Sequence, residues 1–204
     1  EVKMVDFNVQ EIDIRDYLQS FPARIVGITA MTPAVISAGK VAAAIKKINP
    51  EIIMMLGGAH ASALPLETME ENSAIDIIVF GEGEETAKEV CRKIGGGETL
   101  EGVQGIVYRK NGDIRKNPPR PLIADINSIS IPARELEEYS FYKKSHVSRG
   151  FSRRYFNILE LMTSRGCPNR CIFCAGHINY CVSLRFRGFD NIAREIEDCG
   201  RRYG

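Results

Sequence analysis

Short apolar runs alternate with amphipathic stretches over the first hundred residues of the chain. Apolar runs of strand length occupy residues 2–7, 24–30, 52–56 and 76–80. Apolar positions at helical spacing lie between and after these runs, over residues 14–21, 34–48 and 87–94. Buried strands that are each followed by a helix are typical of a parallel sheet covered on both faces. The pattern therefore predicts a Rossmann-like, doubly wound α/β domain over residues 1–98.

The pattern changes after residue 98. Residues 105–108 and 113–116 flank an Asn-Gly pair at 111–112, and such a pair between two short runs predicts a β-hairpin. A proline-rich stretch follows over residues 117–135, which indicates a linker. Residues 99–155 are therefore expected to connect two domains.

A last unit is predicted over residues 156–204. Residues 157–162 have strand character, and Asp190 is placed to cap a helix that follows a cysteine-rich loop. The predicted helix has one apolar face, which contains Ile192, Ile196, Cys199 and Tyr203. One strand, loop and helix cannot bury their own apolar surface, and the chain begins at Glu1 without a methionine. We therefore expect a piece of a longer protein.

The charge composition gives no indication of a polyanionic partner. The 204 residues contain 27 Lys and Arg against 26 Asp and Glu, and the resulting net charge of +1 gives no argument for nucleic acid. The basic stretch 143–154 is expected to be a solvated connector, with a surface for an anionic partner as the alternative. No apolar run approaches the roughly 18 residues that span a bilayer, and no signal peptide opens the chain, so we expect no membrane span and a cytoplasmic protein.

Three of the 6 cysteines lie close together, at Cys167, Cys171 and Cys174. Thiolates bind iron–sulfur clusters, and three of them leave one iron of a four-iron cluster open for chemistry. One alternative is a structural zinc site that adds His177 and Cys181 to the last two of these cysteines. Another is an electron-transfer ferredoxin, which requires a fourth cysteine ligand.

The stretch TSRGCPNRCIFC, residues 163–174, resembles the radical S-adenosylmethionine superfamily. The resemblance implies that the three cysteines hold a [4Fe-4S] cluster, whose open iron binds S-adenosylmethionine. One electron then cleaves the sulfonium and gives a 5′-deoxyadenosyl radical. It also implies that Phe173 lies near the adenine, with a core aromatic as the alternative role, and that a reducing protein of ferredoxin or flavodoxin type supplies the electron.

Three loops stand where the predicted front strands end, with the sequences GITAMT, GGAHAS and VFGEGEE. Open α/β sheets bind ligands at this edge. In order and spacing, the loops resemble the cobalamin (B12)-binding domain that precedes the barrel in one class of radical S-adenosylmethionine enzymes. The resemblance implies that the first strand of this domain is missing before Glu1. The implied cofactor-binding residues are Thr29, Ala30, Met31, Thr32, Gly57, Gly58, His60, Gly81, Glu82 and Gly83.

No histidine of the chain has an Asp two residues before it, unlike the cobalt-binding histidine of methionine-synthase-like domains. We therefore expect cobalamin to bind without a histidine ligand. His60 either lines the pocket or is held within a tight turn. A domain that keeps the fold but binds no cobalamin is the alternative.

The resemblance implies an enzyme that performs cobalamin-dependent methyl transfer, or radical rearrangement or cyclisation, on a small-molecule substrate of unknown class. Two alternatives remain: a radical S-adenosylmethionine enzyme without bound cobalamin, and a non-catalytic corrinoid- or metal-binding module. Residues 156–204 correspond to only the first β–α unit of the family's (β/α) partial barrel. The chain alone is therefore expected to be inactive.

Overall fold

A computed structural model of the chain describes residues 1–8, 10–136, 159–174, 176 and 182–203. These residues belong to two compact units. One unit contains Ile14–Ala124 and Arg165–Leu184, and the other contains Glu1–Asp13, Asp125–Ser164 and Arg185–Gly204. The basic stretch 143–154 lies outside the described residues. Among the described residues, no helix has both the length and the apolar character needed to cross a lipid bilayer.

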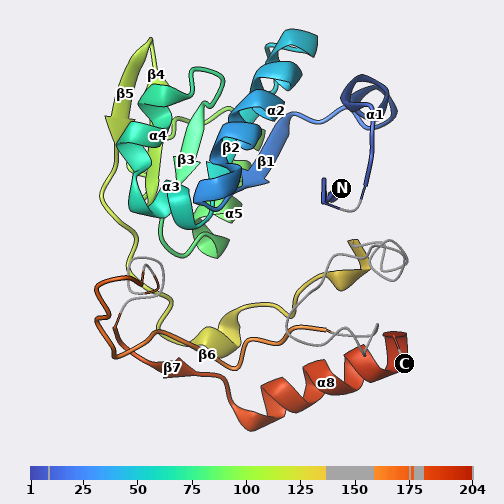
Figure 1. The fold of residues 1–204 in the computed structure, drawn as a ribbon, viewed down its shortest axis with the longest axis vertical. Helices are drawn as coiled ribbons and strands as arrows, with labels where there is room; N and C mark the ends of the chain where they lie inside the picture. The colour runs from blue at the N-terminus through green and yellow to red at the C-terminus, as the bar shows by residue number, and fades with distance from the viewer. Residues whose placement is uncertain (9, 137–158, 175, 177–181, 204) are drawn as a thin grey trace. The chain divides into compact units, whose positions relative to one another are not determined.

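The larger unit is built on a five-stranded sheet in the order β1-β2-β3-β4-β5 (Figure 1). Its strands are β1 (Ile25–Thr29), β2 (Ile53–Gly57), β3 (Ile77–Val79), β4 (Ile106–Lys110) and β5 (Asp113–Lys116). The first three strands run parallel, with Thr29 opposite Gly57, which confirms the predicted strands at 24–30, 52–56 and 76–80. The carboxyl ends of β1 and β2 therefore meet at one edge of the sheet.

Helices cover both faces of this sheet, as the apolar runs predict (Figure 1). One face packs against α2 (Val35–Ile48), α3 (Ala59–Ala63) and α4 (Pro65–Glu71), and the short α1 (Ile14–Ser20) adds Ile14 and Leu18 to the same core. The other face packs against α5 (Glu84–Gly95).

Alternation along the strands explains the two cores. Successive side chains of a strand point to opposite faces, so Leu56 and Ile78 enter the core under α2–α4. Ile77 and Val79 enter the core under α5. Both faces of β3 are buried, which accounts for its continuous apolar sequence.

The predicted hairpin forms, and it extends the sheet. β4 pairs antiparallel with β3, and β5 pairs antiparallel with β4. Asn111 and Gly112 both have positive φ angles, of 54° and 86°, as a two-residue hairpin turn of this kind requires. The sheet is therefore mixed, because the hairpin lies in the same sheet as the parallel strands.

Three local expectations differ from the structure. Residues 2–7 form no strand, and Val2, Met4 and Phe7 are exposed. The segment after Gly58 was expected to be a loop, but it forms the short helix α3 and continues into α4. Of the predicted strand at 157–162, the described part, Leu159–Met162, is not in a strand.

The second unit contains the helix α8 (Phe189–Tyr203), which confirms the predicted C-terminal helix. Within its described residues, this unit also contains the short 3-10 helices η2 (Ile126–Ser128) and η3 (Arg134–Leu136). Asp190 lies in the first turn of α8, where a carboxylate favours the helix dipole, and does not precede the helix as a cap. Two-residue strands, β6 (Ser164–Arg165) and β7 (Arg185–Phe186), form a separate small sheet, and the boundary between the units falls within β6.

The buried face of α8 is more polar than its sequence predicts. Ile196 is exposed, whereas Glu195 is 1% exposed. The carboxylate of Glu195 pairs with Arg134 at 2.6 Å and with Arg187 at 2.5 Å. Arg187 also donates hydrogen bonds to the backbone carbonyl of Met162 at 2.9 Å and to the side chain of Asn191 at 2.7 Å. A buried charge is tolerated when opposite charges and hydrogen bonds satisfy it, which explains a glutamate at this position.

Candidate cofactor-binding site

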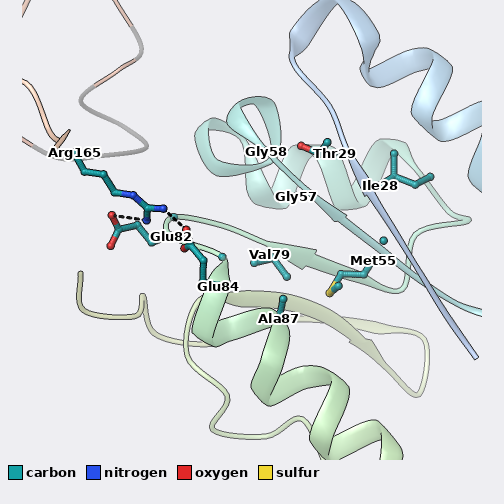
Figure 2. A pocket seen from close by; sticks show the side chains of 13 residues that line it. Ile28, Thr29, Met55, Gly57, Gly58, Val79, Glu82, Glu84, Ala87 and Arg165 are labelled. Carbon is teal, nitrogen blue, oxygen red and sulfur yellow. Dashed lines mark hydrogen bonds and ion pairs between the residues drawn. The ribbon is translucent and has the colours of Figure 1, made fainter. Parts of the chain in front are cut away.

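A cavity of about 420 Å³ opens at the carboxyl ends of β1, β2 and β3 (Figure 2). It lies on the face of the sheet that packs against α5, to which Met55, Val79 and Ala87 contribute side chains. The remaining lining residues are Gly27, Ile28, Thr29, Gly57, Gly58, Gly81, Glu82, Gly83, Glu84 and Arg165. This edge is where open α/β sheets bind their ligands.

Glycines create much of this cavity, because five of its lining residues have no side chain: Gly27, Gly57, Gly58, Gly81 and Gly83. Gly58 is required for a further reason. Its φ is +98°, and a Cβ added there would stand 2.7 Å from Thr29 Oγ1 and 2.8 Å from the carbonyl oxygen of Ala30. The loop after β2 can therefore approach the end of β1 only with glycine at this position.

Hydrogen bonds join the three loops. The amide of Ala30 donates to the carbonyl of Gly57 at 3.1 Å, which holds the first loop against the second. The hydroxyl of Ser62 donates to the carbonyl of Gly58 at 2.9 Å and accepts from the amide of Gly81 at 3.1 Å, which holds the second loop against the third. The loops thus form one preorganised rim.

Six of the predicted loop residues line the cavity: Thr29, Gly57, Gly58, Gly81, Glu82 and Gly83. The other four do not. Ala30 is buried in the core under α2–α4, and Met31 is 70% exposed. His60 Nδ1 lies 3.1 Å from Thr32 Oγ1, so these two side chains contact each other beside the cavity. This contact joins the segment after β1 to helix α3, and the role of His60 stays a prediction.

Charged side chains stand at one side of the cavity (Figure 2). Arg165 pairs with Glu82 at 3.3 Å and also with Glu84. The second carboxylate oxygen of Glu82 accepts a hydrogen bond from the amide of Ile123 at 2.8 Å. Burial alone would lower the pKa of the Arg165 guanidinium, but its hydrogen bonds to Glu84 and Glu82 raise that pKa above the ordinary value.

No pattern in the sequence predicted this ion pair. Arg165 is one residue of the TSRGCP stretch, and the two glutamates lie about eighty positions earlier in the chain. Glu82 was predicted for this site as a cofactor contact, and Glu84 was not. Local pattern carries no information on which distant charges meet, so Arg165 and Glu84 were missed as lining residues.

The three predicted cluster ligands follow β6 directly. Cys167 and Cys171 are half-buried, and Cys174 is exposed. A turn brings the amide of Cys174 to the carbonyl of Cys171 at 3.1 Å, and the amide of Gly176 donates to Cys174 Sγ at 3.4 Å. Phe173, the predicted adenine contact, is 88% exposed.

Three accessible thiols, one of which already accepts a backbone hydrogen bond, fit the chemistry of an iron–sulfur ligand set. Within the part of the chain that the structure describes, no three His, Cys, Asp or Glu side chains converge as a metal site would require. His177 and Cys181, the additional ligands of the zinc alternative, lie outside the described residues. The cluster assignment therefore stays a prediction.

The cavity also tests the cobalamin prediction. A whole corrinoid is larger than about 420 Å³, so the cavity would take one part of the cofactor while the rest lies over the loops. Glycine backbone, small side chains and Met55 suit close contact with a flat, apolar part of a large ligand. The residues present therefore fit a partly inserted corrinoid.

Comparison with known proteins also indicates a B12-binding domain in this part of the chain. Residues 1–91 match the family model described as the B12 binding domain. An uncharacterized methyltransferase of Pyrococcus horikoshii is 35% identical over 207 residues, which cover 100% of this chain and 43% of that protein. The anaerobic magnesium-protoporphyrin IX monomethyl ester cyclase of Rubrivivax gelatinosus is 28% identical, over 93% of this chain and 33% of that protein. The chain thus spans less than half the length of these relatives.

A solved structure shares the fold. The radical S-adenosylmethionine methyltransferase TsrM of Kitasatospora setae has a TM-score of 0.71 and 16% identity, over 92% of this chain and 36% of that one. Residues 1–91 thus match a B12-binding domain, and most of the chain shares the fold of TsrM. The cavity of Figure 2 lies within the part of the chain that matches the B12 model, except for Arg165.

Proposed function

We propose that the chain is the cofactor-binding part of a radical S-adenosylmethionine enzyme that uses cobalamin. The observation that carries the proposal is the glycine-lined cavity at the ends of β1–β3, because six of the predicted cobalamin contacts line it. The structure of TsrM from Kitasatospora setae holds cobalamin and a [4Fe-4S] cluster, which supports the same pair of cofactors for this chain.

The residues have separate proposed roles. Gly57, Gly58 and Gly81 let the cofactor approach the backbone, and Met55 and Ala87 contact its inserted part. When bound, the cluster supplies the electron that cleaves S-adenosylmethionine, and cobalamin supplies methyl transfer or supports a rearrangement or ring closure.

On the cluster side, the thiolates of Cys167, Cys171 and Cys174 bind iron. The amide of Gly176 stabilises the charge on Cys174 Sγ through its hydrogen bond. The exposed ring of Phe173 is free to stack on the adenine of S-adenosylmethionine.

The reaction of the whole protein is methyl transfer or cyclisation of a small molecule, since its relatives include both methyltransferases and a cyclase. Free thiols at the described cysteines fit a reducing compartment, so we place the protein in the cytoplasm. A reducing protein of the ferredoxin or flavodoxin type would deliver the electron there.

Anaerobic reconstitution tests the cluster. The chain is incubated with ferrous iron and sulfide, and bound iron and sulfide are then measured per chain. Cys171→Ala is expected to lose the bound iron, whereas Cys91→Ala, on the exposed surface of α5, keeps it. Equal iron in the two variants refutes the ligand assignment. Uptake of one zinc without sulfide favours the metal-binding module.

Gel filtration with hydroxocobalamin tests the second cofactor. The corrinoid is expected to elute with the chain and to show the absorption spectrum of cobalamin without a histidine ligand. Ala87→Leu fills the cavity and should weaken this binding at least tenfold, whereas Lys88→Leu, on the exposed side of the same helix, should not. Free elution from the wild-type chain would show a domain that keeps the fold without the cofactor.

A further inference from the structure

The ion pairs of Arg165 connect the two candidate cofactor sites. Arg165 lies in β6, two residues before Cys167, and its guanidinium contacts carboxylates on the rim of the cavity (Figure 2). The side chain of Arg165 is 11% exposed and that of Glu82 is 2% exposed. This contact therefore differs from the solvent-exposed ion pairs that contribute little.

Both ends of this connection are held in place. On the cavity side, Glu82 accepts the hydrogen bond from Ile123, and Glu84 begins helix α5. On the cysteine side, Gly166 has a φ of +101°, and a Cβ added there would stand 2.1 Å from the carbonyl oxygen of Ser183. The backbone between Arg165 and Cys167 is therefore fitted tightly against residue 183.

The guanidinium of Arg165 offsets the negative charges of two neighbouring carboxylates. Glu82 lies on the loop after β3 and Glu84 is the first residue of α5, and without a positive charge between them the two carboxylates would repel each other at a partly buried position. The planar guanidinium reaches both carboxylates at once, which a single ammonium group does less well. Because Arg165 is bound to both glutamates, a displacement of Glu82 and Glu84 is expected to displace the backbone at the start of the cysteine loop as well.

We propose that Arg165 is a positioning residue that couples the cavity to the cysteine loop, so that filling one site strengthens binding at the other. This proposal rests on the proposed function, because it assigns the two ends of the coupling to cobalamin and to the iron–sulfur cluster. A coupling of this kind is reciprocal: each cofactor changes the affinity for the other by the same factor.

Amide hydrogen exchange of the chain without cofactors tests whether Arg165 holds the rim of the cavity and the cysteine loop together. Arg165→Met is expected to speed amide exchange in residues 81–84 and also in residues 166–174. Arg170→Met is the matched control, because Arg170 is an exposed arginine of the same loop, and it should change neither segment. Arg165→Lys should restore part of the protection. Faster exchange in only one of the two segments would overturn the proposal.

Glu84→Gln provides a milder change in case Arg165→Met does not fold, since it leaves Arg165 paired with Glu82. A smaller rise in exchange is expected in the same two segments. Glu85→Gln is its control, because Glu85 is exposed and pairs with Lys88 on the surface of α5. Equal exchange in the Glu84→Gln and Glu85→Gln variants contradicts the coupling.

Affinity measurements test the coupling itself. The dissociation constant of hydroxocobalamin is measured before and after anaerobic reconstitution with iron and sulfide. The loaded wild-type chain should bind hydroxocobalamin about fivefold or more tightly than the empty chain, a typical size for coupling between sites. The ratio should fall to about one in Arg165→Met and persist in Arg170→Met.

The outcomes separate the two proposals. If the wild-type chain binds both cofactors but the ratio is one, the coupling is refuted and the proposed function stands. If the ratio is the same in Arg165→Met as in the wild type, another route carries the coupling and the role of Arg165 is refuted. If neither cofactor binds, both proposals fail.

Discussion

The backbone amide of Gly81 donates a hydrogen bond to the hydroxyl of Ser62 at 3.1 Å, across the gap between the loops that follow β3 and β2. The same hydroxyl donates to the carbonyl of Gly58 at 2.9 Å. One small side chain of α3 thus satisfies a donor and an acceptor on two different loops. The geometry of the rim depends on a residue that does not line the cavity.

Replacing Ser62 by Ala is expected to lower the free energy of unfolding by about 1 kcal/mol, because the amide of Gly81 loses its partner, whereas the carbonyl of Gly58 keeps the hydrogen bond from the backbone amide of residue 62. Urea unfolding followed by circular dichroism measures the change. Ser37→Ala, on the exposed side of α2, controls for the effect of alanine in a helix and should stay within about 0.5 kcal/mol of the wild type. Equal stabilities of the two variants contradict the role given to Ser62.

Gly58→Ala combines backbone strain with a steric conflict. With a φ of 98° and a ψ of −173°, Gly58 has a backbone conformation that is essentially restricted to glycine and costs alanine about 1–3 kcal/mol, and the added Cβ also conflicts with Thr29 Oγ1 and Ala30. Gly97→Ala is the comparison for positive φ without a steric conflict, because Gly97 has a φ of +68° but no atom within 4 Å of an added Cβ. Thermal unfolding of both variants should therefore show the larger loss for Gly58→Ala. A loss no larger than that of Gly97→Ala would show that the loops can shift apart.

Glu195→Ala is expected to lower the free energy of unfolding by about 3–5 kcal/mol, because Arg134 and Arg187 would lose a buried counter-charge. Chemical denaturation measures the change, with a probe that reports on the unit containing α8. Glu197→Ala, exposed on the same helix, should change stability little. Similar values for the two variants would show that water, rather than Glu195, satisfies the two arginines.

The carboxyl of Glu98 should titrate below the usual range for glutamate. The hydrogen bond from Lys93 at 3.2 Å and the charge of Arg92 at 2.8 Å lower its pKa. A depressed carboxyl pKa contributes stability that is present above the unfolded-state pKa and is lost as the pH falls through the folded-state pKa. NMR titration of the Glu98 side chain at low and high salt checks this shift, which should shrink as salt screens the exposed pairs. A normal pKa at low salt would contradict it.

The strands could be predicted from the sequence because burial on both faces leaves a direct signal, as in the continuous run around Ile77 and Ile78. The Asn111-Gly112 turn was equally clear, since few residues accept its positive φ angles. By contrast, the apolar residues near Val2 suggested a strand, but strand formation requires a pairing partner that composition does not reveal.

The candidate site could be predicted only in part. Glycine pairs at strand ends identified the loops, because close backbone approach restricts which residues fit there. The five-residue helix α3 is too short for a periodic pattern to identify. Contacts such as Arg165 with Glu84, or Arg187 with Glu195, depend on which charges the fold brings together, and no local pattern encodes them.

The hairpin that extends the sheet has a consequence for solubility. β5 is the outer strand beyond β4, and its sequence is Asp-Ile-Arg-Lys. Unpaired backbone groups on an outer strand can pair with another chain, and charged side chains there discourage such association. Asp113, Arg115 and Lys116 lie along this edge, and pairing with another strand would remove part of the water around these charged side chains. The hairpin thus protects the cofactor-binding sheet from growing by aggregation at that side.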